Sequence, residues 1–378
     1  MNKRLLFIVN VDWFFMSHRL PIAREALNHG YEVHIATSLT NSNLDKLHSY
    51  GLVVHPLEIA RSNIGLLGEV KTFLQILNIC KRLRPQVVHL VTIKPVILGG
   101  IVARLLRVPA MVAAISGLGT AFATGKNKKT ILRLSVQKLY QFALGHFNSV
   151  VIFQNPEDRD DFLKFKAIRC EQVRLIRGSG VDLNEYKFHP EPLGRVVVTM
   201  AARLLKDKGV FEYAEAAKLL HSRGMPVEFR LIGAVDNDNP TSLSVAELET
   251  LVQEGQIKYL GYREDIPVQY AASNIVCLPS YYREGLPKSL IEAAACGRAV
   301  VTTDMPGCRD AIEPGVTGLL VPPQNAVALA DAIQYLIENP NLRNKMGSSG
   351  RELAENYFCI KKIVAQHLAL YDELVSSS

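Results

Sequence analysis

The chain has 378 residues, of which 48% are hydrophobic and 21% are charged, with both charge signs spread along its length. This composition excludes a disordered chain, and the length predicts two domains, each with its own core. The formal net charge of +7 favours anionic partners, but the Lys and Arg residues follow no nucleic-acid-binding pattern, so we expect no nucleic-acid partner.

The first half of the chain alternates short apolar runs with segments of helical period, which is typical of parallel strands covered by helices. The N-terminal apolar run is interrupted at Asp12 and precedes no cleavage site, so we interpret it as a core strand and not as a signal peptide. The expected strands are 5–11, 32–37, 87–91, 110–115, 149–153 and 173–176, and the expected helices are 17–29, 65–83, 95–106 and 128–145.

A turn-rich segment at 178–194 separates this half from a second series of the same kind. The strands expected in the second series are 195–201, 227–233, 257–261, 274–280, 299–303 and 318–322. We therefore predict an α/β protein with two Rossmann-like doubly wound domains that face a cleft, residues 1–189 and residues 190–356. Residues 357–375 have the period of an amphipathic helix, and the C-terminal segment 357–378 could pack back on the first domain.

The cysteines and the apolar segments indicate where the protein resides. Six scattered cysteines form no C-x-x-C pair, which predicts neither disulfides nor a zinc site and favours a reducing cytosol. The most apolar region, 87–117, is broken by one His, one Lys and two Arg residues before it reaches the length of a membrane span. We expect a cytoplasmic protein that is soluble or peripheral on the inner face of the cell membrane.

A stretch of the second half, YYREGLPKSLIEAAACG at 281–297, places two acids around the start of a predicted helix. Pro287 suits the first turn and Gly297 suits the C-terminal cap, which predicts a helix over 287–296. Glu284 then precedes the helix, and Glu292 lies about 7 Å inside it along the axis. The helix N-terminus between them attracts phosphate. A sugar nucleotide, with a central diphosphate and hydroxyl groups at each end, fits this layout. Alternatively, Glu284 could simply favour the helix dipole and Glu292 could be a solvated surface acid.

Several motifs of the second half follow the order found in one enzyme family. The spacing of Glu284 and Glu292 resembles the E-x7-E motif of the retaining, family-4-type glycosyltransferases, which have the two-domain GT-B fold. ARLLKDKG at 202–209 resembles the family's GRLxxxKG, and FRLIG at 229–233 resembles its strand ending in Gly. The resemblance covers most of the chain, is strongest over 196–335, and continues through 261–280, 305–325 and 330–333.

The resemblance implies a role for each matching residue. Arg203 and Lys208 resemble the basic pair that binds the donor diphosphate, and two cations at the end of a strand are what a departing diphosphate requires. Glu284 resembles the catalytic residue near the transferred sugar, and Glu292 resembles the residue that binds the ribose hydroxyls. The other implied donor contacts are the phosphate-binding backbone of Gly285, Leu286, Pro287 and Lys288, and the segment from Arg263 to Ile266 beside a uracil.

Residues of the first half are candidates for the other side of the cleft. Gly117 and Gly119, in SGLGT, are expected to form a turn that faces the donor, since Gly permits close approach of the backbone. His18 could face the cleft or be structural. Many relatives have a glycine-rich turn where this chain has residues 10–21, which we expect to form a bulky acceptor-side loop. Two residues could cap the helix that follows, Asn10 and Ser17.

The chain also departs from the family pattern. Ala202 replaces a Gly, and Asp310 stands where the family commonly has Glu. Asp236 and Asp238 form a D-x-D pair, which binds metal in a different glycosyltransferase fold, but here the pair falls in a loop and is interpreted as a polar turn. Because the basic pair supplies the positive charge, we expect no metal and no other cofactor.

The resemblance implies a retaining glycosyltransferase that moves a sugar from a UDP-sugar to an acceptor hydroxyl, with no identified enzymic base. VDWFFMSHRLP and IKPVILGG resemble bacterial relatives that extend lipid-linked oligosaccharides, capsules or O-antigens. We therefore expect an N-acetylhexosamine or hexose donor and a polyprenyl-diphosphate-linked saccharide acceptor, in the assembly of cell-surface glycans or glycoprotein glycans. The basic segment 126–147 could lie on an anionic membrane surface or pack as an ordinary helix on a sheet.

Two alternatives share this fold, a UDP-sugar epimerase and a non-catalytic module that binds sugar nucleotides. A nicotinamide-dependent oxidoreductase is disfavoured because no G-x-G-x-x-G follows the first strand.

Overall fold

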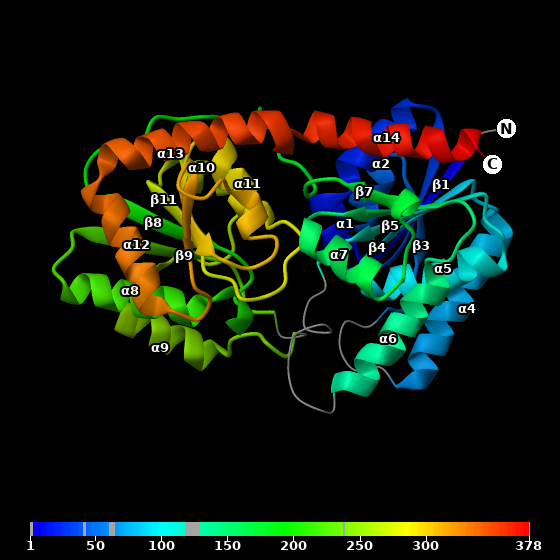
Figure 1. Ribbon diagram of the computed structural model, residues 1–378, viewed down its shortest axis with the longest axis horizontal. Coiled ribbons are helices and arrows are strands. Elements are labelled where there is room, and N and C mark those ends of the chain that lie inside the picture. Colours follow the sequence, from blue (N-terminus) through cyan, green and yellow to red (C-terminus); the bar gives the residue numbers. More distant parts are fainter. Residues whose placement is uncertain (1–2, 41–42, 60–64, 118–128, 237–238, 378) are drawn as a thin grey trace. The chain divides into compact units, whose positions relative to one another are not determined.

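The computed structural model describes residues 3–40, 43–59, 65–117, 129–236 and 239–377. The chain forms two compact units, drawn in Figure 1, each with its own sheet and hydrophobic core. Unit 1 comprises Met1–Ser179 and Lys361–Ser378, and unit 2 comprises Gly180–Ile360.

Unit 1 is built on a seven-stranded sheet whose neighbouring strands are all parallel. The strand order is β3-β2-β1-β4-β5-β6-β7. The central strands β4, β5 and β6 are buried at every position because helices cover both faces of the sheet. The strands are β1 (Lys3–Val11), β2 (Tyr31–Ser38), β3 (Val53–Pro56), β4 (Val87–Val91), β5 (Ala110–Ile115), β6 (Ser149–Phe153) and β7 (Val173–Leu175).

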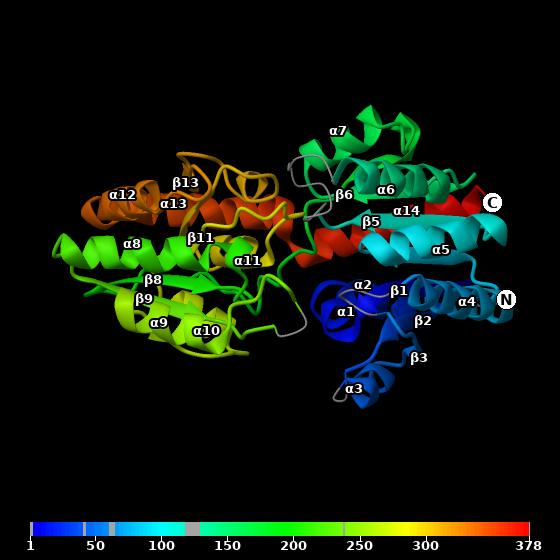
Figure 2. The ribbon, with the colours of Figure 1, turned by 90° about the horizontal axis from the view of Figure 1, so that it is seen from below.

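The helices of unit 1 form a layer on each face of this sheet. On one face α5 (Ile93–Leu105) packs between α4 (Leu66–Leu83) and α6 (Lys129–Ala143), as Figure 2 shows from below. On the other face lie α2 (Leu20–Asn28) and the C-terminal helix α14 (Ile360–Ser376). The remaining elements are α1 (Asp12–His18), α3 (Leu44–Ser49), α7 (Pro156–Lys164) and η2 (Cys170–Gln172).

Unit 2 repeats the arrangement on a six-stranded parallel sheet of order β10-β9-β8-β11-β12-β13. When the strands of each unit are numbered from 1 in chain order, the first six strands of both sheets have the Rossmann order 3-2-1-4-5-6. The predicted fold class, two Rossmann-like doubly wound α/β domains, is therefore confirmed. The strands are β8 (Val196–Ala201), β9 (Val227–Ile232), β10 (Lys258–Tyr259), β11 (Ile275–Leu278), β12 (Ala299–Thr303) and β13 (Gly318–Val321).

The helices of unit 2 also cover both faces of its sheet. On one face α8 (Val210–Ser222) packs between α9 (Val245–Gly255) and α12 (Ala326–Glu338), and on the other α11 (Lys288–Ala295) packs on α13 (Pro340–Leu353). The shorter elements are α10 (Ile266–Ala271), η3 (Lys206–Lys208), η4 (Arg309–Ala311) and η5 (Ala354–Phe358). In the part of the chain that the structure describes, no helix is long and apolar enough to cross a membrane.

Unit 1 differs from the prediction in several parts, among them the helices α3 and α7, which were not predicted. The predicted loop 10–21 is largely helical, since α1 begins directly after β1 and α2 follows at once. The carboxylate of Asp12 in the first turn favours this start. Neither Asn10 nor Ser17 caps a helix, because the N-cap positions are Val11 and Arg19. Strand β3 was not predicted, because it lies at the sheet edge and has no buried residue to produce an apolar run.

The chain leaves unit 1 and enters unit 2 before residue 189, which is where the sequence placed the domain boundary. Residue 181 already belongs to unit 2, because Val181 N donates to Phe358 O at 2.8 Å and Ile360 N donates to Val181 O at 3.0 Å. Tyr186 lies in the core of unit 2. The turn-rich composition of the segment therefore marks irregular backbone that packs on the second unit, and the second crossing follows at Ile360.

Candidate functional site

The candidate residues of unit 2 follow the carboxyl ends of its strands. Arg203 comes after β8, Asp236 after β9, Arg263 after β10 and Glu284 after β11. Strands β8 and β11 are neighbours, and the connections leave them toward opposite edges of the sheet. This reversal is the topological switch point, where open α/β sheets bind ligands. The predicted donor residues that follow these strands thus lie at the end of the sheet where such folds bind ligands.

Lys208 and Glu284 meet at this switch point. Lys208 Nζ forms an ion pair with Glu284 Oε1, and the two side chains are only 13% and 12% exposed. Ser280, which is fully buried, donates from Oγ to the same carboxylate oxygen at 3.0 Å. A buried charge is stable only when an opposite charge compensates it. Lys208 and Glu284 therefore stabilise each other's positions.

Backbone contacts of Asp207 fix the loop that carries Glu284. The carbonyl oxygen of Asp207 accepts from Tyr281 N at 3.0 Å and from Tyr282 N at 3.1 Å. Ser280 Oγ lies 3.2 Å from the same oxygen. The loop after β8 and the loop after β11 are therefore joined beside Lys208. Burial raises the pKa of the Asp207 carboxyl, although the nearby Lys208 acts to lower it.

Two glycines allow the backbone segments of the site to approach closely. Gly209 has φ +80°, and a Cβ there would lie 2.2 Å from the carbonyl oxygen of Pro279. Gly307 has φ +81°, and a Cβ there would lie 2.5 Å from Gly285 O. Both conformations suit glycine. Asp310 accepts from Gly307 N at 2.9 Å, so this acid supports the turn behind Glu284.

Helix α11 begins at Lys288, one residue after the start that the sequence predicted. Pro287 is the N-cap, with φ −62° and an extended ψ of 121°, and the helix runs Lys288–Ala295. Gly297 follows the helix at φ +73°, and Arg298 N donates to Ala293 O at 3.0 Å, so the predicted C-terminal cap is present.

Glu292 is a buried acid on α11, and the interpretation as a solvated surface acid is wrong. The residue is 7% exposed. Lys288 Nζ lies 3.3 Å from Glu292 Oε1, and the Tyr186 hydroxyl forms a hydrogen bond with the same carboxylate. Burial raises the pKa of Glu292, and Lys288 opposes this only in part.

The predicted cations Arg203 and Arg263 are exposed, and each contacts an acid. Arg203 donates from an Nη atom to Asp236 Oδ2 at 3.1 Å, which gives the first acid of the D-x-D pair a structural partner. Arg263 donates two hydrogen bonds of 2.7 Å to Asp265. The side-chain hydrogen bond from Arg263 lowers the pKa of Asp265 to about 2. Ile266 opens α10 directly afterwards. Asp238 lies outside the described residues.

The candidates from the first half belong to unit 1. His18 ends α1, and its ring stacks on Phe14 with centroids 4.0 Å apart. Its Nδ1 lies 3.2 Å from Phe14 O, so the ring contacts its own helix. Gly117 follows β5 with φ +95°, as a turn requires. Gly119 lies outside the described residues.

Sequence reasoning missed three residues that hold the site together, Ser280, Asp207 and Tyr186. Ser280 could have been found, because it ends the strand predicted at 274–280 and precedes Glu284 by four positions. Asp207 acts through its backbone carbonyl, which no side-chain pattern reveals. Tyr186 approaches Glu292 from the segment between the predicted domains, and only the folded chain brings them together.

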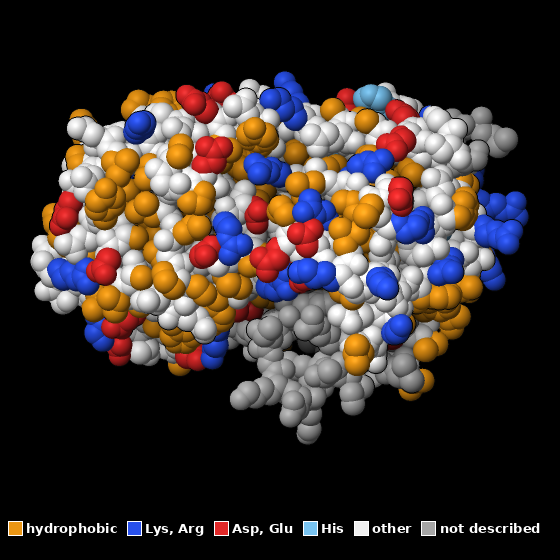
Figure 3. Space-filling view, viewed as in Figure 1, with side chains coloured by type: hydrophobic (Ala, Val, Ile, Leu, Met, Phe, Trp, Pro, Cys, Tyr) orange, Lys and Arg blue, Asp and Glu red, His pale blue; other side chains and the backbone are white. Residues whose placement is uncertain are grey.

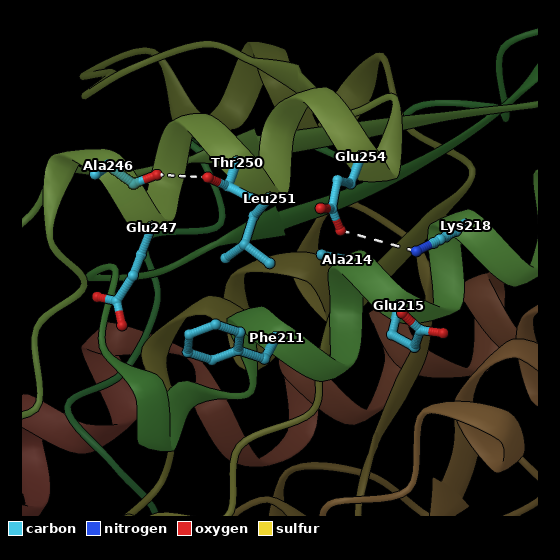
Figure 4. A pocket seen from close by; sticks show the side chains of 9 residues that line it. All are labelled: Phe211, Ala214, Glu215, Lys218, Ala246, Glu247, Thr250, Leu251 and Glu254. Carbon is cyan, nitrogen blue, oxygen red and sulfur yellow. Dashed lines mark hydrogen bonds and ion pairs between the residues drawn. The ribbon is translucent and has the colours of Figure 1, made fainter.

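A separate groove of about 570 Å³ lies between α8 and α9 and shares no residue with this site. Figure 4 shows Phe211 of α8 and Leu251 of α9 pointing toward each other, and Lys218 reaching toward Glu254, at 3.8 Å. Among the described residues, no group of three or more His, Cys, Asp or Glu side chains is arranged to hold a metal ion.

Each half of the chain matches a protein-family model. Residues 4–155 match the model described as Glycosyl transferase 4-like, and residues 183–353 match the model described as Glycosyl transferases group 1. The two matches correspond to most of unit 1 and most of unit 2.

Similar proteins cover the chain over most of its length. An N,N'-diacetylbacillosaminyl-diphospho-undecaprenol alpha-1,3-N-acetylgalactosaminyltransferase of Campylobacter jejuni is 29% identical over 99% of this chain and 100% of that protein. A UDP-Gal:alpha-D-GlcNAc-diphosphoundecaprenol alpha-1,3-galactosyltransferase of Escherichia coli is 26% identical over 83% of this chain and 82% of that protein. The crystal structure of Anabaena HepE in complex with UDP has a TM-score of 0.76 and 21% identity, and covers both chains completely.

Proposed function

We propose a specific reaction for this chain, which belongs to the glycosyltransferases whose 4-like and group 1 models match its two halves. The reaction is transfer of a hexose or N-acetylhexosamine from a UDP-sugar to a saccharide acceptor carried on polyprenyl diphosphate, with retained configuration. The buried pair of Lys208 and Glu284, at the switch point beside the N-terminus of α11, is the observation that carries the proposal.

Departure of the nucleoside diphosphate is the step that these residues assist. Negative charge develops on the leaving phosphate, and Lys208, Arg203 and the first N–H groups of α11 supply positive charge from fixed positions. As the resemblance to the E-x7-E motif implies, we assign Glu284 to the transferred sugar and Glu292 to the ribose. The backbone from Arg263 to Ile266 is assigned to the uracil. We assign no enzymic base: the acceptor oxygen bonds to the anomeric carbon on the face from which the diphosphate departs, and the hydroxyl proton passes to the departing diphosphate.

The relatives' names support the choice of donor and acceptor. The Escherichia coli relative is named for UDP-galactose, and both relatives are named for undecaprenyl-diphosphate-linked acceptors and α products. Common UDP-hexoses hold their sugar in an α bond, so an α product corresponds to retention. The anomeric configuration of this chain's product, read by NMR, tests that part of the proposal.

Substitution of Glu284 tests the catalytic assignment. Glu284→Gln keeps the shape of the side chain and removes its charge, so we expect turnover to fall at least about 100-fold, as for loss of one electrostatic contact in other enzymes. Release of UDP with a polyprenyl-diphosphate saccharide acceptor is the measurement. The exposed acid Glu313 provides the matched control, and Glu313→Gln is expected to keep normal turnover.

Loss of the fold must be separated from loss of chemistry in this test. Breaking a buried pair leaves one charge uncompensated and costs about 3–5 kcal/mol of stability. The double variant Lys208→Met/Glu284→Gln removes both charges, and we expect it to recover thermal stability but not turnover. A folded Glu284→Gln protein with near-normal turnover contradicts the proposal. Conversion of the donor without any acceptor indicates the epimerase alternative, and binding without conversion indicates the binding module.

We further propose that transfer needs no metal ion. Lys208 and Arg203 provide the charge that a divalent cation supplies in metal-dependent transferases. We expect turnover to change less than about twofold when EDTA replaces added Mg²⁺ or Mn²⁺, since the stabilising charges belong to the protein. UDP release measured before and after chelation decides the question. A loss of turnover with EDTA that is restored by Mn²⁺ contradicts metal independence and leaves the transferase assignment intact.

A further inference from the structure

Glu292 is held by two donors that come from different parts of unit 2. On the face drawn in Figure 3, acidic and basic side chains lie beside one another at the surface, whereas Glu292 is only 7% exposed. Lys288, one turn earlier on α11, places Nζ 3.3 Å from Glu292 Oε1. The hydroxyl of Tyr186 donates to the same carboxylate from the segment that precedes β8. The carboxylate is therefore anchored along its own helix and also from outside it.

The two donors differ in how firmly they are held. The Lys288 side chain is 30% exposed and ends in a flexible stem, so water competes for its ammonium group. Tyr186 is 7% exposed, and its ring lies in the core of unit 2. Close packing leaves a buried aromatic ring few accessible rotamers, so its hydroxyl keeps one position. Tyr186 is thus the more rigid of the two anchors.

The backbone of Tyr186 is tied to the helix that carries Glu292. Arg351 of α13 donates from Nη1 to Tyr186 O at 2.9 Å and to Ala295 O at 2.8 Å. Ala295 is the last residue of α11, so one guanidinium joins the two segments. Tyr186 N also donates to Asp182 O at 2.8 Å. The position of Tyr186 relative to α11 is therefore fixed by main-chain contacts as well as by the packing of its ring.

The hydrogen bond from Tyr186 leaves the carboxylate of Glu292 able to bind a ligand. A carboxylate has two oxygens with about four acceptor sites, and Lys288 and one phenol hydroxyl occupy only part of them. Two hydroxyls on adjacent carbons, as in ribose, donate to one carboxylate only when its plane is suitably oriented. A donor that fixes this plane before binding reduces the conformational entropy that is lost when ribose binds.

We propose that Tyr186 is a positioning residue that orients the carboxylate of Glu292 toward the ribose hydroxyls of the donor nucleotide. This inference rests on the proposed function, because it takes the ribose contact of Glu292 from there. It adds a residue that acts on the donor only through Glu292. A purely structural role of Tyr186 would reside in its ring, which the substitution Tyr186→Phe preserves.

Two nucleotides that differ only at the ribose test this role. The probes are UDP and dideoxy-UDP, an analogue without the two ribose hydroxyls, and affinity is measured by isothermal titration calorimetry. We expect the unmodified protein to bind UDP at least about tenfold more tightly than dideoxy-UDP, because hydrogen bonds to a charged group are lost with the analogue. In Tyr186→Phe this ratio should fall below about threefold, while the affinity for dideoxy-UDP changes less than about twofold.

The matched control is Tyr213→Phe, since Tyr213 is fully buried in the same core and its hydroxyl donates to Val198 O and Arg230 O, both at 2.9 Å. This variant is expected to lose stability and to keep the preference for UDP. A Glu292→Met background, which has no acceptor for the hydroxyl, shows whether Tyr186 acts through Glu292. In that background Tyr186→Phe should leave the ratio of the two affinities unchanged.

The proposal is overturned if Tyr186→Phe discriminates between the two probes as strongly as the unmodified protein does, or if Tyr213→Phe loses the discrimination to the same extent. It is also overturned if the unmodified protein binds both probes equally, because Glu292 then makes no ribose contact. UDP release during transfer by the unmodified protein, measured in parallel, shows whether the transferase assignment fails independently.

Discussion

Glu292 is a buried carboxylate whose surroundings compensate its charge only in part. Its pKa in the folded chain is raised, since burial outweighs the hydrogen bond from Tyr186 and the contact with Lys288. A folded pKa above the unfolded value means that the ionised form costs stability at neutral pH, and that this cost disappears as the pH falls through the folded pKa. An acid kept in such a position is typical of a binding residue.

Glu292→Gln is therefore expected to change stability and donor binding in opposite directions. Thermal unfolding at neutral pH should shift to higher temperature, because the amide removes the buried charge and keeps an oxygen acceptor. The KM for the donor should rise about 10-fold to 100-fold, which corresponds to loss of a hydrogen bond to a charged group. A lower melting temperature combined with an unchanged KM assigns Glu292 a purely structural role and contradicts the proposed ribose contact.

At the scale of elements, α14 is attached to unit 1 by a buried polar cluster. Tyr371 of α14 contacts His89 of β4, with Tyr371 Oη and His89 Nδ1 2.5 Å apart, and His367 stacks on His89 with ring centroids 5.7 Å apart. Arg19, fully buried nearby, adds a positive charge. Burial lowers the pKa of both histidines, that of His367 to about 3. Both imidazoles are therefore neutral in the folded protein.

This cluster predicts acid sensitivity of unit 1. A lowered folded pKa contributes stability above the unfolded value of about 6.5, and this contribution is lost as the pH falls. Between about pH 7.5 and pH 5, His367 should account for a loss of about 2 kcal/mol in the free energy of unfolding. Urea titrations followed by the fluorescence of Trp13, the only tryptophan, report on unit 1 at both pH values.

The substitution His367→Gln removes the titrating group from the cluster. Between about pH 7.5 and pH 5, we expect the free energy of unfolding of this variant to fall by about 2 kcal/mol less than that of the unmodified protein. The exposed control His48→Gln is expected to keep the original pH dependence. An unchanged pH dependence in His367→Gln shows that other groups are responsible for any acid sensitivity.

At the scale of the whole molecule, the chain builds two parallel sheets with the same order of their first six strands, and it passes between the units twice. The first crossing lies at Ser179 and Gly180, and the second at Ile360 and Lys361. The second crossing gives α14 to unit 1, where Asp372 accepts from the Tyr31 hydroxyl at 3.2 Å and the Leu374 carbonyl accepts from Asn148. The C-terminal segment is thus a structural part of the first unit.

The sequence by itself determined the two series of parallel strands, the helix at α11 and the acids on either side of its start. These features depend on local properties: apolar runs for strands buried on both faces, Pro and Gly at helix ends, and a fixed spacing along one helix. The same local rules missed β3, whose edge position leaves its residues without burial, and the helical start of the loop 10–21.

Only the tertiary structure decided how the site is held. Lys208 and Glu284 are 76 positions apart, and they meet because β8 and β11 are adjacent in the sheet. Asp207 and Tyr186 became part of the site through contacts between segments that are distant in sequence. Such contacts depend on strand order and on backbone carbonyl positions, which side-chain patterns do not encode.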